Sequence, residues 1–461
     1  MKRIYRHIGI FLSALALLTG CNLDFTPTDA VADATITEEN YEHLLTGVYD
    51  AAQNLPAFHS DTSADNLNST WTPELDYNSL TAANATIYSY WNSLYKGVQL
   101  ANNLINLIGD DTRYSHITAQ ARFLRAYFYH LIAENWGDAP LLVSSGTENA
   151  VRTPEADIWK FIISDLEYAA SYAPGFTNPG FVSATAAKAF LARVNLIAPQ
   201  GVGDRAEAVR LAEEVITDGN FALADDPADI WHHKTSREFI LYWTNTPNDT
   251  GNSGWFLRSS LVPRYEARYG AGSAGYGEFG RYEYPVDMAL VRAFEPGDLR
   301  LEASIRHLVL DDEETWDCVK YPSYNSADNW PAIRIAEMYL VAAEAAGYPA
   351  GVTRLNELRE KRGLRPLVPG QEIDAPTFLR RIMEERRVEL AFEGFRYYDL
   401  RRWFTSGDDG KQAVLELSAQ AHTPLSSDFF TVSDDGHELL YPVPTKAIDL
   451  NPALLPNNRG Y

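Results

Sequence analysis

The sequence predicts a mainly α-helical protein in which pairs of helices form a scaffold that large irregular insertions interrupt. Three observations support this fold class. Apolar residues recur at helical spacing through much of the chain, and many of the resulting segments are separated only by short turns. Two long stretches, 55–86 and 221–329, lack this spacing and are rich in Asn, Asp, Gly, Pro, Tyr and Trp. Because loops on a rigid scaffold often carry binding residues, we expect the function to lie in these insertions.

The first helical segment follows Thr35-Ile36-Thr37-Glu38, which has the spacing of a capping box. Similar apolar spacing predicts helices over about 88–108 and 120–135. The second of these is apolar around most of its circumference, which predicts burial between other helices. It should end at Trp136-Gly137-Asp138-Ala139-Pro140, where glycine permits the terminal turn and proline prevents continuation.

The remaining predicted helices are 157–172, 184–197, 205–218, 332–346, 352–362 and 377–403. Small residues alternate with large ones in 186–194, as in tetratricopeptide units, although no fixed repeat length survives the insertions. We therefore predict a tetratricopeptide-like scaffold of helix pairs. In the last helix, acids and arginines recur three residues apart, which predicts structural ion pairs. The expected pairs are Arg386 with Glu389, Glu393 with Arg396, Arg396 with Asp399, and Asp399 with Arg402.

Composition excludes two broad classes of protein. The 461 residues are 46% hydrophobic, so the chain can bury a core large enough to offset the entropy of ordering and is not disordered. The 39 basic and 62 acidic residues give a formal net charge of -23. Sequence-independent affinity for nucleic acid comes from Lys and Arg at phosphates, so this acidity argues against a DNA or RNA partner.

The N-terminus has the pattern of a secretory signal. A basic start precedes an apolar run from Ile8 to Leu18, and Leu18-Thr19-Gly20-Cys21 resembles a bacterial lipobox, in which the cysteine is lipidated. We expect residues 1–20 to be a lipoprotein signal peptide, 21–34 a flexible lipid-anchored tether, and 35–461 a single helical domain. An ordinary signal peptide with an incidental cysteine is the alternative. No apolar run of about 20 residues follows, so the lipid would be the membrane contact.

Motifs for catalysis, metals and cofactors are lacking. The glycines of 270–275 match the spacing of a dinucleotide loop, but no apolar strand precedes them and no helix pattern follows. His232 and His233 are adjacent, so they cannot face one metal from one side of a regular element. We therefore predict no catalytic residue, no metal site and no cofactor. A glycoside hydrolase would need two carboxylates about 5 to 9 Å apart, which sequence alone cannot nominate among 62 acids.

Several segments, taken in order, are similar to one known family. They are 91–102, 121–129 with the closing 136–141, 294–300, 334–345, 355–359, 385–403, 441–444, 448–452 and 460–461. Together with the lipobox they resemble the SusD/RagB family of bacterial outer-membrane lipoproteins. The resemblance implies a surface-exposed protein that covers a SusC-type TonB-dependent outer-membrane transporter. It further implies capture of oligosaccharides, or peptides in some branches, for import, without a cofactor or catalysis.

Neutral sugars present CH faces and hydroxyl groups, so a binding site needs flat aromatic surfaces and a few polar side chains. Two stretches provide both, 61–77 and 255–284. The family's glycan sites draw an aromatic platform from the region of the first. The predicted ligand-binding residues are Asp65, Asn66, Trp71, Tyr77, Trp255, Tyr276 and Tyr282. Trp71 and Tyr276 are preferred, because turn-forming residues surround both; the alternative is that these aromatics pack the loops onto the scaffold.

Three functions follow from these observations. The first is a lipid-anchored glycan-binding protein of a SusC/SusD-type import complex. The second is a peptide-capturing member of the same fold, in which the arginines of 258–281 would matter more than stacking. The third is a surface glycoside hydrolase, which lacks any catalytic motif.

Overall fold

The computed structural model describes residues 37–55, 59–69, 73–76, 78–144, 150–232, 236–246, 284–310, 313–322, 328–421 and 431–461. Two compact units divide the chain, Met1–His43 and Leu44–Tyr461. In the first unit, Thr37 forms a capping box with Asn40 around the short 3-10 helix Glu38–Asn40. Thr35 and Ile36, the start of the expected capping box, lie outside the described residues.

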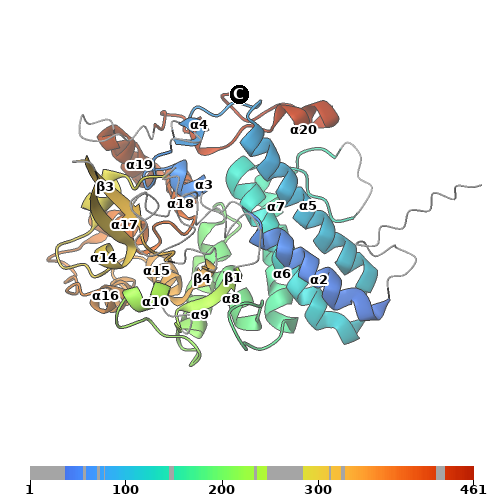
Figure 1. Cartoon of the computed structure of the whole chain (residues 1–461), viewed down its shortest axis with the longest axis horizontal. Helices are drawn as coiled ribbons and strands as arrows, with labels where there is room; N and C mark the ends of the chain where they lie inside the picture. The colour runs from blue at the N-terminus through green and yellow to red at the C-terminus, as the bar shows by residue number, and fades with distance from the viewer. Residues whose placement is uncertain are drawn as a thin grey trace, which may run out of the picture. The chain divides into compact units, whose positions relative to one another are not determined.

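The first half of the chain is helical (Figure 1). Its helices are α2 (Tyr41–Gln53), α3 (His59–Thr62), α4 (Pro73–Asp76), α5 (Ala85–Ile108), α6 (Ser115–Trp136), α7 (Glu155–Tyr172), α8 (Ala184–Ile197), α9 (Arg205–Ile216) and α10 (Ala228–His232). The second half contributes α13 (Met288–Ala293), α14 (Arg300–Ser304), α15 (Ile335–Ala346), α16 (Val352–Lys361), α17 (Ala375–Glu389), α18 (Arg396–Thr405), α19 (Asp408–Ala421) and α20 (Thr445–Leu450). Further 3-10 turns are Thr112–Tyr114, His437–Leu439 and Pro452–Leu454.

The long helices pack in sequence order. In the second unit α5 packs against α6, α6 against α7, α7 against α8, and α8 against α9 (Figure 1). After the second insertion, α15 packs on α9 and α16 on α15, so the stack continues across a gap in the helical sequence. The mainly helical, tetratricopeptide-like prediction is confirmed.

Helix α6 lies at the centre of this stack and is buried on nearly all sides, as its apolar circumference predicts. Its neighbour α5 approaches closely at Gly97, where an added Cβ would lie 2.5 Å from Cζ of Phe128. Helix α6 ends at Gly137, which has a φ of 66° that a residue with a side chain rarely adopts. The glycine therefore sets the predicted end of the helix.

The predicted helix 377–403 is two helices, which corrects the sequence interpretation. Helix α17 ends at Glu389 and α18 begins at Arg396. Between them Phe392 has a φ of 65° and Gly394 a φ of 82°, conformations that no α-helix contains. Likewise, the predicted start of 332–346 belongs to a strand, and α15 begins at Ile335. Side-chain hydrogen bonds from far along the chain stabilise the break, so local periodicity could not reveal it.

Two small antiparallel sheets complete the fold. Strand β1 (Phe239–Trp243) pairs with β4 (Trp330–Arg334), and β2 (Ile305–Leu310) pairs with β3 (Glu313–Cys318). All four strands fall within or at the edge of the predicted insertion 221–329. The backbone N–H of Ile335 donates to the carbonyl of Glu238 at 2.8 Å, so the β1–β4 pair leads directly into α15.

A buried ion-pair network joins these strands to α17. Arg334 binds Glu238 at 2.6 Å and Glu393 at 2.7 Å, and Arg362 binds Glu238 at 2.8 Å. Burial alone would raise the pKa of Glu389, but the guanidinium groups of Arg362 and Arg334 hold it well below its usual range. The network is structural, as predicted, although several partners differ from the expected ones. The Asp399–Arg402 pair forms at 2.8 Å, whereas Arg386 binds Asp399.

In the described part of the chain, no helix is both long enough and apolar enough to cross a membrane. Cys21 and the whole of 1–34, on which the predictions of signal peptide, lipidation and tether depend, lie outside the described residues.

Candidate ligand-binding site

The first predicted binding stretch contacts the segment that directly follows the second one. Leu67 forms an isolated antiparallel bridge with Val286. The N–H of Asn68 donates to the carbonyl of Pro285 at 2.9 Å, and the N–H of Asp287 donates to the carbonyl of Asn66 at 3.0 Å. Leu67 belongs to the stretch 61–77, and Pro285 follows directly after 255–284. The bridge therefore brings the first stretch to the end of the second, although they are far apart in sequence.

Asp65 lies beneath this bridge in a buried ion pair. Its two carboxylate oxygens accept from Nε and Nη2 of Arg396 at 2.6 and 2.9 Å, and Nη2 of Arg387 lies 3.1 Å from Oδ2. Burial would raise the pKa of Asp65, but the charges of Arg387 and Arg396 lower it to about 2. Only 4% of the residue is exposed. These contacts favour a supporting role for Asp65, and its predicted contact with the ligand stays a prediction.

Asn66 has a similar supporting place. Its amide nitrogen donates to Oδ1 of Asp61 at 2.8 Å, and its amide oxygen accepts from Nε of Arg387 at 3.1 Å. The residue is 1% exposed, so a sugar hydroxyl cannot reach these atoms without displacing the present partners. The role of Asn66 in ligand binding stays a prediction, and its described contacts are those of a supporting residue.

Asp61 stabilises the break between α17 and α18. Its carboxylate accepts from the N–H of Phe392 at 3.1 Å and from the N–H of Gly394 at 2.8 Å. These bonds offset the strain of the positive φ at Phe392. Burial nevertheless raises the pKa of Asp61 to about 6. Residues 61–66 of the first predicted stretch and the α17–α18 turn thus form one buried unit.

Two further acidic residues near the bridge, Asp76 and Asp287, accept hydrogen bonds from backbone N–H groups. Asp76 accepts from the N–H of Ser69 at 2.8 Å, and Asp287 caps α13 by accepting from the N–H of Ala289 at 2.6 Å. Burial raises the pKa of Asp76 to about 6, and the negative charge of Asp287 contributes to that shift. Asp76 therefore fixes the backbone within the stretch 61–77, and Asp287 fixes the backbone of the segment that follows 255–284.

The aromatic residues of the prediction cannot be placed in this way. Trp71, Tyr77, Trp255, Tyr276 and Tyr282 all lie outside the described residues. Their role in ligand binding remains a prediction. The described residues near them in sequence include Leu67 and Val286, which form the bridge.

A cleft of about 440 Å³ adjoins this region. Residues of α13, α17 and α19 line it, and α13 begins two residues after Val286. The volume lies within the range of about 300 to 1,000 Å³ that ligand pockets occupy. Sequence reasoning missed this cleft. A signal was present, because Arg380, Glu384 and Arg387 recur at helical spacing and so predict one charged face on α17.

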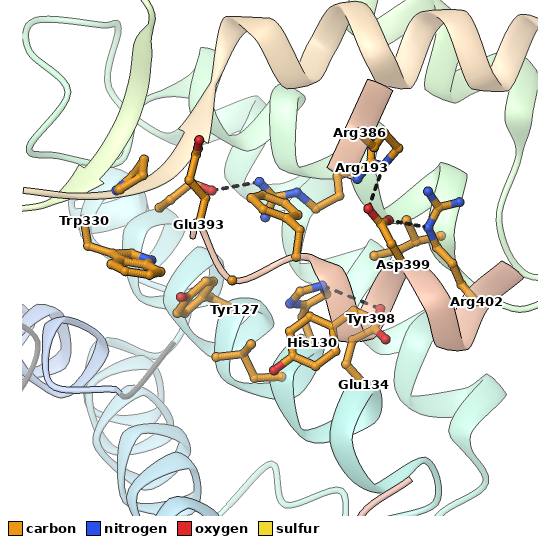
Figure 2. A pocket seen from close by; sticks show the side chains of 16 residues that line it. Tyr127, His130, Glu134, Arg193, Trp330, Arg386, Glu393, Tyr398, Asp399 and Arg402 are labelled. Atoms are coloured by element: carbon orange, nitrogen blue, oxygen red, sulfur yellow. Dashed lines mark hydrogen bonds and ion pairs between the residues drawn. The ribbon is translucent and has the colours of Figure 1, made fainter. Parts of the chain in front are cut away.

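A smaller pocket of about 40 Å³ lies between α6, α8 and α18. Figure 2 shows the side chains that line it. Asp399 accepts there from Nε of Arg386 and from Nε of Arg402, both at 2.8 Å. On α6, Nε2 of His130 lies 3.9 Å from a carboxylate oxygen of Glu134. Burial raises the pKa of Glu134 to about 8 and lowers the pKa of His130 well below its usual range. These shifts favour the uncharged form of both groups, and a cavity this size holds a few waters and not a sugar ring.

A wider cleft of about 550 Å³ lies beyond this cavity, lined by residues of α7, α8, α15 and α18. Its charged groups already bind one another. Arg401 binds both oxygens of Glu155 at 2.9 and 2.8 Å, and Arg402 binds those of Glu344 at 2.5 and 2.8 Å. The cleft is therefore built from the structural network and presents little uncommitted charge.

One group in the described part of the chain has three side chains that a metal could bridge, Asp435, His437 and Glu438. Asp435 already binds Nδ1 of His437 at 2.9 Å and Nη2 of Arg459 at 3.0 Å. The group is partly exposed, and protein partners occupy its atoms. The prediction of no metal site therefore stays a prediction.

Two family models match the chain. One, described as "SusD family", matches residues 317–461, and the other, described as "Starch-binding associating with outer membrane", matches residues 23–196. SusD-like protein P2 of Formosa agariphila is 26% identical over 433 residues, which cover 82% of this chain and 81% of the relative. A SusD-like protein of Bacteroides ovatus is 23% identical and covers 86% of this chain and 82% of its own length.

Solved structures share the fold over nearly the whole chain. A laminarin-binding SusD-like protein has a TM-score of 0.74 at 21% identity and covers 92% of this chain and 100% of its own. Surface glycan-binding protein A from Bacteroides uniformis has a TM-score of 0.76 at 21% identity and covers 92% of this chain and 99% of its own. At such identities the structures show the fold alone. The two family models, which match residues 23–196 and 317–461, and the SusD-like relatives matched over most of the chain show that the chain belongs to the SusD family.

Proposed function

We propose that this protein captures oligosaccharides or polysaccharides at the cell surface for import through a SusC-type TonB-dependent transporter. The observation that carries the proposal is the Leu67–Val286 bridge, where the first aromatic and polar stretch meets the end of the second. Backbone hydrogen bonds fix the described ends of the two stretches at this bridge, which supports a common binding surface. The names of two structural relatives, one laminarin-binding and one glycan-binding, support the ligand class.

Aromatic stacking would supply most of the affinity. A tryptophan or tyrosine ring offers a flat apolar surface to the CH face of a sugar and loses few torsions on binding. Trp71 and Tyr276 are the proposed stacking residues, with Tyr77, Trp255 and Tyr282 around them. Asp65 and Asn66 fix the backbone below, because their side chains are bound to Arg387, Arg396 and Asp61.

We propose binding without catalysis. Glycoside hydrolysis needs two carboxyl groups that flank a bound sugar, one of them with a raised pKa. The acids with a raised pKa of about 6 to 8, Asp61, Asp76 and Glu134, are at most 3% exposed and sit in protein contacts. None of the three borders the 440 Å³ cleft. Their pKa values follow from burial in the scaffold.

The family description places such proteins at the outer membrane. We propose that a lipid on Cys21 anchors this chain there and that 22–34 acts as the tether. Globomycin treatment, which blocks removal of lipoprotein signal peptides, would cause the precursor to accumulate. Protease digestion of intact cells would then test whether the mature protein is exposed at the surface.

Calorimetric titration of the soluble form that begins after Cys21 tests the function. The ligands are a panel of bacterial, plant and host polysaccharides and a peptide mixture, with product analysis of the same samples. We expect one glycan to bind without products, and Trp71→Ala or Tyr276→Ala to weaken binding by about 1 to 3 kcal/mol. Tyr172→Ala is the matched control, because Tyr172 is an aromatic on α7 that is 52% exposed. Peptide binding alone would support peptide capture, and released sugars would show that the protein is an enzyme.

A further inference from the structure

The cleft between α13, α17 and α19 has the chemistry of an anion site. Five arginines and three glutamates line it, in a protein whose net charge is -23. We propose that this cleft binds the carboxylate of a uronic acid residue, so that the ligand is an acidic oligosaccharide. This inference rests on the glycan-binding function proposed above and specifies the class of glycan.

Four of the five arginines have carboxylate partners at the cleft or beneath it, and one of these four is Arg396, which binds Asp65. Arg381 binds Glu295 at 2.9 Å and Glu384 at 3.2 Å, Arg380 binds Glu416 at 2.5 Å, and Arg387 binds Asp65 at 3.1 Å. These pairs hold the arginines in place along one side of α17. They also show that the cleft already accommodates carboxylate groups opposite its guanidinium groups.

Arg292 is the donor that a ligand in the cleft can reach, whereas Arg396 lies deeper and adds positive charge beneath it. Arg292, on α13, is exposed and makes no ion pair within the described residues. Arg396 is 3% exposed and binds Asp65 through Nε and Nη2, while its Nη1 is buried without a hydrogen bond among the described groups. Asp65 is bound by Arg387 as well, so this group of three side chains has one positive charge in excess. A guanidinium with free donors is well suited to a planar carboxylate, because both carboxylate oxygens can accept.

The rest of the lining suits a sugar ring. Ala289, Ala293, Met383, Ala413 and Leu417 provide apolar surface beside the charged groups. A sugar acid has an apolar CH face and one charged edge. The apolar side chains could contact the CH face, and the arginines could bind the carboxylate. The cleft also begins where the bridge ends, since Met288 follows Val286 by two residues.

The net negative charge of the protein does not prevent this binding. Salt screens exposed charges beyond about 8 Å at physiological ionic strength, so a carboxylate in the cleft responds mainly to the nearest guanidinium groups. A long polyanion lying along the whole surface would meet acidic residues instead. This favours one carboxylate recognised in the cleft over a densely sulfated chain.

Matched pairs of ligands test the inference by calorimetry on the soluble form. Each pair is a uronate oligosaccharide and its carboxyl-reduced counterpart, which keeps the same backbone without the charge. The acids are galacturonan, glucuronan, mannuronan, guluronan and glucuronoxylan oligosaccharides. We expect at least one acid to bind about tenfold more tightly than its reduced form, and this preference to shrink as salt is added.

Arg292→Ala should weaken binding of that acid about fivefold and leave its reduced form unaffected. Arg365→Ala is the control, because Arg365 is 81% exposed and does not line the cleft. Ala293→Trp, which fills the cleft without changing charge, should abolish the preference. Equal binding of acid and reduced forms, or a preference that Arg292→Ala leaves intact, would overturn the carboxylate site but not glycan capture. Binding of peptides and of no glycan would overturn both.

Discussion

Arg396 binds Asp65 through two parallel hydrogen bonds, from Nε to Oδ1 at 2.6 Å and from Nη2 to Oδ2 at 2.9 Å. The pair joins the first predicted binding stretch to the first turn of α18. Asp61 also binds the turn between α17 and α18, so residues 61–66 and this turn are held together by buried polar contacts. We expect changes at these residues to affect folding before they affect ligand binding.

Asp65→Ala should destabilise the fold. Removing one partner of a buried ion pair leaves the charges of Arg387 and Arg396 uncompensated, which costs about 3 to 5 kcal/mol. Urea unfolding followed by tryptophan fluorescence measures the change. Asp157→Ala is the control, because its pair with Lys160 is at 2.8 Å but has side chains 53% and 62% exposed, and its loss should cost under about 1 kcal/mol. If Asp65 instead contacted the sugar, Asp65→Ala would weaken binding and leave unfolding unchanged.

Glu134→Gln should stabilise the protein at neutral and alkaline pH. The unfolded chain releases the Glu134 proton near the ordinary pKa of 4.5, whereas burial raises the folded pKa to about 8. Between these values the folded state holds the proton and the unfolded state does not, so the unfolding free energy falls as pH rises. Glutamine has nearly the same shape as the protonated glutamate and does not ionise, so the variant should not lose unfolding free energy in this way as pH rises. Arg401 retains Glu155 as its partner.

The expected gain is about 1 to 3 kcal/mol near pH 8 and close to zero near pH 4. Urea unfolding over a pH series measures it, with the exposed acid Glu167 on α7 changed to Gln as the control. A variant that is less stable than the parent near pH 8 would show that Glu134 is ionised there and paired with Arg401.

Local patterns predicted the scaffold well because they report local structure. The spacing of apolar residues located α6 and α8, and glycine followed by proline located the end of α6 at Trp136. The same patterns joined α17 and α18 into one helix, because the break depends on Asp61, which is more than 300 residues away in sequence. Periodicity carries no information about such a partner.

The candidate site was predicted less completely, for a related reason. Composition identified the two stretches that meet near the Leu67–Val286 bridge, but not which polar residues in them face a ligand. Asp65 and Asn66 were chosen because their side chains can bind hydroxyl groups, yet the fold brings arginines to them. Conversely, Arg292 belongs to no sequence motif, so no pattern in the sequence was a reason to select it. It lines the cleft because α13 packs beside α17.

Gly97→Ala should destabilise the contact between α5 and α6. The added Cβ would lie 2.5 Å from Cζ of Phe128, whose ring is fully buried, so side chains or backbone must shift at a cost of about 1 to 3 kcal/mol. Gly47→Ala is the matched control in α2, because nothing lies within 4 Å of the added atom. That change should stabilise by about 0.5 to 1 kcal/mol. Phe128→Leu in the Gly97→Ala background should recover part of the loss, and equal effects at both glycines would contradict close packing at Gly97.

Cys318 should be unreactive until the protein unfolds. The residue is 4% exposed, and burial raises the pKa of its thiol to about 12, so very little thiolate forms near neutral pH. The chain has two cysteines, so the soluble form that begins after Cys21 carries Cys318 alone. A disulfide reagent such as Ellman's reagent should therefore release no colour from the native protein and one equivalent in concentrated urea.

The rate of this labelling also reports stability, because the reagent reaches the thiol only when the region around β3 opens. Asp65→Ala should accelerate labelling of Cys318, whereas Asp157→Ala should not. Rapid labelling of the native parent would show that β3 opens independently of the buried ion pairs around Glu389 and Glu393. The β2–β3 sheet would then be a separate, less stable part of the fold, even though Lys320, two residues after Cys318, binds Glu393 at 2.7 Å.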